Sequence, residues 1–135
     1  MHFLPELSSD NESSIYRCPN GSEVPFYTDV NYSMNWRLGH DNGTAQTGFK
    51  ANLAITSNHA NETIFFMDGA NNRSIVWAAE LANSAYVYAD DKNLRMARHQ
   101  DKANIVYLDG HVEGKSGSQL LPMGTLAYTS NLWTP

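Results

Sequence analysis

The strongest constraint on the fold is an Asp-Gly dipeptide that separates two short runs of strand-forming residues. Asn104–Leu108 is followed by Asp109-Gly110 and then by His111–Gly114. Glycine tolerates positive φ, and aspartate can hydrogen-bond to its own backbone, so this pattern is typical of a tight β-hairpin. We therefore expect an antiparallel hairpin over residues 104–115.

Two upstream segments indicate a sheet that this hairpin could join. Thr63–Met67 is a continuous apolar run of strand length that ends at Asp68-Gly69, which predicts a central strand. Asp29–Leu38 is rich in aromatic and β-branched residues and favours a short strand or an extended segment. Loops are expected on both sides of a short buried piece over residues 49–55.

Two further segments carry mixed signals. In Ile75–Tyr88 the alanines and Leu81 favour a helical turn, whereas the stretch Tyr86–Tyr88 favours a strand, so both alternatives stay open. Gln119–Pro135 holds enough apolar residues to dock on the body of the fold instead of extending into solvent.

Length, composition and net charge limit the kinds of protein that this chain can be. The chain has 135 residues, about the size of one compact unit, so we expect a single domain over residues 1–135. Its 41% hydrophobic and 17% charged residues predict a folded chain instead of a disordered one. The formal charge of −5 and the lack of a Lys/Arg cluster argue against nucleic acid as a partner.

The N-terminal region has the composition of a truncated or frayed end of a longer segment. Met1–Ser14 mixes a short apolar patch with serine, asparagine and aspartate, which indicates a truncated or frayed end. Cys18-Pro19-Asn20-Gly21 combines a helix breaker with turn formers, so the backbone must reverse or loop there. No run approaches the roughly 20 apolar residues that a membrane helix needs.

Most chemistry-bearing residues lack a spacing that specifies a site. Residues 114–119 do not match the Gly-x-Ser-x-Gly turn of a serine nucleophile. Nothing in the sequence places a histidine beside Cys18, the single cysteine, which favours a buried or idle thiol. The five histidines form no His-x3-His pair, which argues against zinc. Acidic loop residues could hold calcium, but no Asp-x-Asp ladder accompanies them.

The most specific pattern is His99, nine intervening residues, and then Asp109-Gly110. An imidazole at the entry to a hairpin can donate to a backbone carbonyl or pair with a carboxylate, which would lock the entry loop onto the sheet. The alternative is a ligand or metal site shared by His99 and Asp109. We favour the structural role.

This pattern resembles the H-X9-DG domain of prepilin-type proteins. Arg98-His99 and Asp109–Val112 carry the signature, so the resemblance makes His99, Asp109 and Gly110 the family-motif residues. Weaker landmarks follow in the family's order, and the resemblance covers nearly the whole chain. These landmarks are Tyr16–Pro19, Asn31–Asn35, Thr63–Asp68 and Leu132–Pro135.

The resemblance implies an α+β fold, namely a pilin- or pseudopilin-like soluble head with an antiparallel β-sheet. Members carry an N-terminal hydrophobic helix that is missing from this sequence, so we expect the sequence to begin after it. The sheet would include Thr63–Met67 and the hairpin over residues 104–115. Calcium sites in pseudopilin heads make Asp68 and Asp109 candidate calcium ligands; no other cofactor is implied.

The resemblance also implies a function. The chain would be a structural and assembly component of a type II secretion or type IV pilus-like system, and not an enzyme. Its partners would be other pseudopilin subunits and secretion-system components. It would lie on the periplasmic or extracellular face, anchored in the inner membrane only through the missing helix.

Two rival functions stay open. The first is an extracytoplasmic module that binds polysaccharide or an exported protein through exposed aromatic rings; two or more exposed rings on one flat face would favour it. The second is a hydrolase that uses His99 with Asp109 or Asp68 in a concave pocket. The aromatic candidates for the binding module are Trp36, Trp77, Tyr86, Tyr88 and Trp133.

Overall fold

The hairpin lies at one edge of a five-stranded sheet in the computed structural model, which describes residues 18, 32–39, 58–69, 75–88, 96–127 and 129–133. β4 (Lys102–Tyr107) and β5 (Val112–Ser116) pair antiparallel, with Val106 opposite Val112. Gly110 has a φ of 89°, and its N–H donates to Tyr107 O at 2.9 Å. The hairpin is therefore confirmed, together with the conformational reason for its glycine.

Gly110 allows a test of the turn that involves backbone conformation alone, because no atom lies within 4 Å of the place its Cβ would occupy. We expect Gly110→Ala to lower the free energy of unfolding by about 1 kcal/mol, since an L side chain disfavours positive φ. Gly114→Ala is the matched control in the same hairpin, with its nearest neighbour at an ordinary 3.5 Å. Equal losses of stability in urea denaturation would contradict this explanation of the turn.

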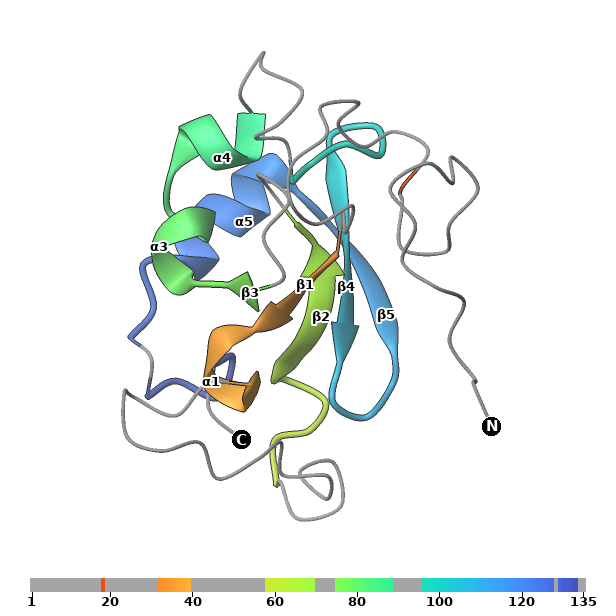
Figure 1. Cartoon of the computed structure of the whole chain (residues 1–135), viewed down its shortest axis with the longest axis vertical. Coiled ribbons are helices and arrows are strands. Elements are labelled where there is room, and N and C mark those ends of the chain that lie inside the picture. Colours follow the sequence, from red (N-terminus) through yellow and green to blue (C-terminus); the bar gives the residue numbers. More distant parts are fainter. Residues whose placement is uncertain are drawn as a thin grey trace.

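The apolar run before Asp68-Gly69 forms the central strand, as the sequence predicts. β2 (Ile64–Asp68) lies between β1 (Tyr32–Asn35) and β4 and is antiparallel to both. β3 (Ile75–Val76) adds a short parallel pairing at the outer edge of β1. The strand order is β3-β1-β2-β4-β5 (Figure 1).

Short helices fill the connections. α1 (Trp36–Gly39) follows β1 directly, so the strand predicted over residues 29–38 ends at Asn35 in the described region. The side-chain Oδ1 of Asn35 accepts the N–H of Arg37 at 3.0 Å, which turns the chain at this point. α5 (Gly117–Met123) follows β5.

The ambiguous segment contains a strand and two helices. After β3 come α3 (Ala78–Leu81) and α4 (Ser84–Tyr88), so the strand interpretation of residues 86–88 is wrong. The Asn83 side chain accepts the N–H of Ala85 at 2.9 Å and starts α4. Val87 is buried from this helix, and tertiary packing thereby overrides its β propensity.

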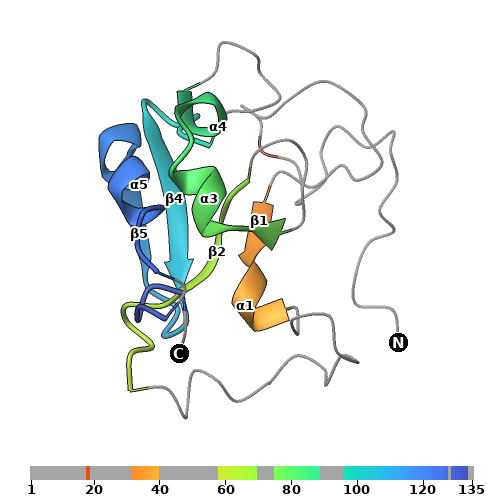
Figure 2. The ribbon, with the colours of Figure 1, turned by 90° about the vertical axis from the view of Figure 1, so that its left-hand side faces the viewer.

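The core lies between the sheet and α3, α4 and α5, which gather on one side of it (Figures 1 and 2). Inward-facing residues of β4 alternate with outward-facing ones, as expected for a sheet with one covered face. Leu120 and Trp133 are both fully buried, so the C-terminal region does dock on the body. The buried core residues are Ile64, Met67, Val76, Ala78, Leu81, Val87, Met96, Ala103, Ile105, Tyr107, Leu120 and Trp133.

Four antiparallel strands with short helices make this an α+β fold, as expected. Within the described residues, the helices are all too short or too polar to cross a membrane. The expectations for Met1–Ser14, for the turn after Cys18 and for residues 40–57 lie outside the described residues.

Candidate functional site

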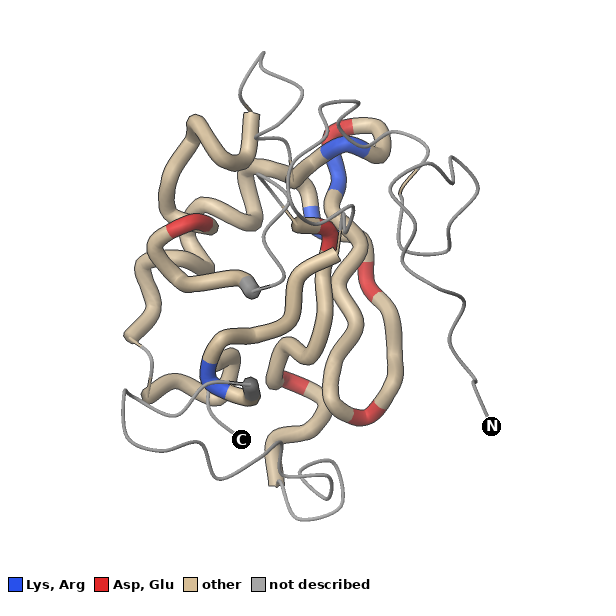
Figure 3. Tube along the Cα trace, in the orientation of Figure 1, with Lys and Arg blue, Asp and Glu red and all other residues tan. Residues whose placement is uncertain are grey.

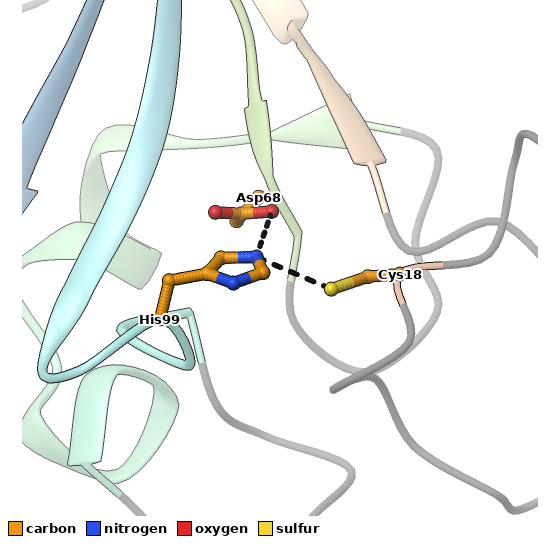
Figure 4. A group of neighbouring side chains, drawn as sticks. All are labelled: Cys18, Asp68 and His99. Atoms are coloured by element: carbon orange, nitrogen blue, oxygen red, sulfur yellow. Dashed lines mark hydrogen bonds and ion pairs between the residues drawn. The ribbon is translucent and has the colours of Figure 1, made fainter.

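Three side chains from distant segments meet at one end of the sheet. Cys18 Sγ lies 3.2 Å from His99 Nε2, and Asp68 Oδ1 lies 3.6 Å from the same ring nitrogen. One donor atom from each residue falls within 4.8 Å of the other two. Figure 4 shows the thiol and the carboxylate both directed at one edge of the imidazole. We call Cys18, Asp68 and His99 the three-residue cluster.

A tight turn positions His99 immediately before β4. The N–H of His99 donates to Lys102 O at 3.0 Å, and the N–H of Lys102 donates back to His99 O at 3.2 Å. Between them Gln100 and Asp101 have φ values of 56° and 61°. Two successive positive φ values are the geometry of a type I′ turn, which reverses the chain and fixes the start of the strand.

Asp68 is the last residue of β2 and is fully buried. Because successive side chains of a strand alternate and Met67 packs in the core, Asp68 faces the side of the sheet away from that core. Its Oδ2 accepts the N–H of Asn104 at 2.7 Å. Its Oδ1 has no hydrogen-bond partner among the described residues.

The cluster contains a carboxylate that is buried away from water. Burial raises the pKa of Asp68, and the N–H of Asn104 and the positive charges of Arg98 and His99 oppose this rise. The pKa of Tyr32, the register partner of Asp68, is also raised, first by burial and then by the negative charge of Cys18 and Asp68. A cation at this point would relieve the cost of burying the carboxylate.

The geometry does not suit a nucleophilic relay. In such a relay the carboxylate holds one ring nitrogen while the nucleophile contacts the other. Here Cys18 and Asp68 both approach Nε2 of His99. Cys18 is only 4% exposed, so a substrate would have little access to its sulfur. Convergence of three donors on one point is instead the arrangement of a chelating site.

The structure does not bring His99 and Asp109 together. They lie beyond opposite ends of β4, a strand of six residues, which corresponds to about 20 Å. Asp109 Oδ1 instead accepts the N–H of His111 at 3.0 Å and lies 2.6 Å from His111 Nδ1. A site shared by His99 and Asp109 is therefore wrong, whereas the other pair of the hydrolase alternative, His99 with Asp68, does lie together in the three-residue cluster.

The calcium candidates are separated in the same way. Asp68 lies beside Asn104 at the start of β4, whereas the N–H of Asp109 donates to Ala60 O at 3.1 Å at the hairpin end. Cys18 and His99, the neighbours of Asp68, offer sulfur and nitrogen, which are poor ligands for calcium. The two aspartates thus do not form a joint calcium site.

The hairpin carries a second group of polar side chains. The Tyr107 hydroxyl donates to Glu113 Oε2 at 3.4 Å, and burial together with the Glu113 charge raises the pKa of Tyr107 to about 12. The Tyr107 ring stacks on His111 with centroids 4.3 Å apart, and Lys115 Nζ lies 2.6 Å from Glu113 Oε1. These contacts reinforce the hairpin and leave Asp109 and His111 at its exposed tip.

A pH dependence follows for the hairpin. Because the folded pKa of Tyr107 lies above the model-compound value of 10.0, its contribution to stability is complete below pH 10 and is lost as the pH rises towards about 12. We expect Tyr107→Phe to lack this alkaline loss. Ultraviolet titration of the phenol, compared between wild type and Tyr107→Phe, measures the pKa directly; a difference curve centred at 10 would contradict the assignment.

The aromatic candidates do not form an exposed platform. Trp133 is fully buried, and of the five rings only Tyr88, at 42%, falls in the exposed range. Trp36 and Trp77 are half-buried and stack on each other with centroids 4.9 Å apart. The condition set for the binding module, two or more exposed rings on one flat face, is not met by these residues.

Sequence reasoning missed the three-residue cluster. The histidines lack the helical spacing of paired zinc ligands, but the donors of the cluster come from three separate segments. No family model matches the chain, and no curated protein or solved structure matches it either. The sequence did pair His99 with Asp68 in the hydrolase alternative, and Cys18, Asp68 and His99 all belong to landmarks that resemble prepilin-type proteins.

Proposed function

We propose that this chain is the head of a prepilin-type, pseudopilin-like subunit with a structural role in a type II secretion or pilus-like fibre. The observation that supports this role is that both ends of the H-X9-DG element serve the framework of one hairpin. His99 closes the turn before β4, and Asp109-Gly110 forms the turn after it. A sequence signature whose residues form the turns of a hairpin suits an assembly protein better than an enzyme.

An apolar row on the sheet provides a surface for assembly. Met34 is the register partner of Phe66, Phe66 of Val106, and Val106 of Val112, so the four side chains share the face away from the helices. Phe66 is 38% and Val112 63% exposed. Neighbouring subunits of a fibre bury surfaces of this kind.

The electrostatics agree with protein partners. Acidic and basic positions are interspersed over the described part of the chain and form no single basic face (Figure 3). The partners in this proposal are other pseudopilin subunits and secretion-system components. The head would lie on the periplasmic or extracellular face, held by a hydrophobic N-terminal helix of the full-length protein.

Fractionation of the native protein tests this function. Its source cells should yield it in the membrane fraction and in fibres sheared from the surface, with a processed, apolar N-terminus by mass spectrometry. Recovery in the cytosol with Met1 as its first residue would contradict the proposal.

The apolar row supplies a matched pair of variants. We expect Val112→Lys to lower the amount of sheared fibre at least several-fold, because it places a charge in the row. Leu126→Lys is the control, since Leu126 is 46% exposed and lies after α5, away from the row. Equal fibre yields from the two variants would show that the apolar row is not the assembly surface.

A further inference from the structure

We propose that Cys18, Asp68 and His99 bind a divalent cation of the zinc class, and that the ion fastens the Cys18 segment to the end of the sheet. This goes beyond a structural head, which needs no metal at this place. Three features support it: the separations of the donor atoms, a buried carboxylate oxygen without a hydrogen bond in the part of the chain that the structure describes, and the chemistry of the three donors.

The donor separations fit a tetrahedral ion. Zinc lies about 2.3 Å from sulfur and about 2.0–2.2 Å from nitrogen and oxygen, so tetrahedral angles place neighbouring donors about 3.3–3.6 Å apart. In the cluster, sulfur to nitrogen is 3.2 Å and nitrogen to oxygen is 3.6 Å. These two separations are within a few tenths of an ångström of the tetrahedral values, and the sulfur and the carboxylate oxygen lie within 4.8 Å of each other.

One oxygen of the Asp68 carboxylate is held by a hydrogen bond, and the other has none within the described part of the chain. The N–H of Asn104 holds Oδ2 at 2.7 Å, while Oδ1 is buried, faces the cluster and has no hydrogen-bond partner among the described residues. The 3.6 Å to His99 Nε2 is too long for a hydrogen bond. Outer contacts that orient a ligand in this way are typical of metal sites.

The mixed donor set selects the ion. A thiolate and an imidazole suit zinc and similar metals, and they exclude calcium and magnesium, which prefer oxygen. Thiolate and carboxylate together carry two negative charges, which a divalent ion neutralises inside the buried site. The side chain of His99 is 29% exposed, so the cluster lies close to water, which supplies the fourth ligand in many zinc sites.

Cobalt provides a spectroscopic probe of the site. The full chain is stripped with a chelator and titrated with Co²⁺, which absorbs through a sulfur-to-metal charge-transfer band when a thiolate binds. We expect this band to saturate at one ion per chain and to disappear when Zn²⁺ is added. Cys18→Ser should abolish the band, and Asp68→Asn and His99→Gln should each weaken binding by about 100-fold or more.

His111→Gln is the control, because His111 is an exposed histidine beside a carboxylate but lies at the hairpin tip. It should bind Co²⁺ as tightly as the wild type. A measurement on the wild type alone avoids any effect of substitutions on folding: Zn²⁺ should slow alkylation of Cys18 at least 10-fold. The absence of the charge-transfer band, or equal alkylation rates with and without Zn²⁺, would overturn the proposal.

Discussion

Trp133→Ala is expected to lower the free energy of unfolding by about 3–5 kcal/mol, which is the cost typical of removing a buried tryptophan. Trp133 is fully buried within the main hydrophobic core, and it reaches that core from the last described segment of the chain. Its removal therefore opens a large cavity and detaches this segment from the sheet. Denaturation by urea, followed by circular dichroism, measures the change.

Trp36→Ala is the matched control for Trp133. Trp36 is half-buried and stacks on Trp77, so its removal should cost about 0.5–1.5 kcal/mol. If the two substitutions destabilise the protein equally, Trp133 does not anchor the C-terminal segment in the core.

Asn35→Asp is the second large effect, with an expected loss of about 3–5 kcal/mol because it leaves a buried charge without compensation. Asn35 is fully buried, and its Nδ2 donates to Ile64 O at 3.0 Å and to Trp133 O at 3.1 Å. Aspartate cannot donate to these carbonyls, and its charge would face two carbonyl oxygens. The loss should shrink in acid, where the new carboxyl takes up a proton.

The control for Asn35 is an exposed asparagine in the same part of the molecule. Asn131 Nδ2 donates to Glu62 Oε2 at 2.8 Å on the surface, so Asn131→Asp should cost less than about 1 kcal/mol. A loss for Asn35→Asp that is equally small, or independent of pH, would show that Asn35 does not join β1, β2 and the C-terminal segment.

Both substitutions probe the same feature, the closure of the fold by its C-terminal segment. The N–H of Ile64 donates to Leu132 O at 3.0 Å, and the Thr63 hydroxyl donates to Asn131 O at 2.5 Å. These bonds join the C-terminal segment to the residues at the start of β2. The chain end thereby becomes part of the structural framework.

The hairpin and the central strand were predictable because their signals are local. Asp109-Gly110 needs only its own positive φ and two adjacent runs, and Thr63–Met67 is apolar throughout. The helix α4 was not predictable from the same rules, since Tyr86, Val87 and Tyr88 are strand formers that only tertiary packing makes helical.

The complete three-residue cluster could not be predicted from local sequence patterns, for a different reason. Cys18 and His99 lie 81 positions apart, and no local pattern reports a contact over that separation. The turn that positions His99 uses positive φ at Gln100 and Asp101, where no glycine marks it. The sequence predicted a structural His99 near the hairpin and named Asp68 as its partner in the hydrolase alternative, but it did not place Cys18 beside them.

Anomalous diffraction at the zinc absorption edge, from crystals of the full chain grown with zinc, tests most directly whether His99 forms one site with Cys18 and Asp68. We expect one strong peak at about 2.0–2.3 Å from Sγ of Cys18, Nε2 of His99 and a carboxylate oxygen of Asp68. Density that shows the three side chains apart, or a zinc peak at Asp109 and His111 with none in the cluster, would contradict the account.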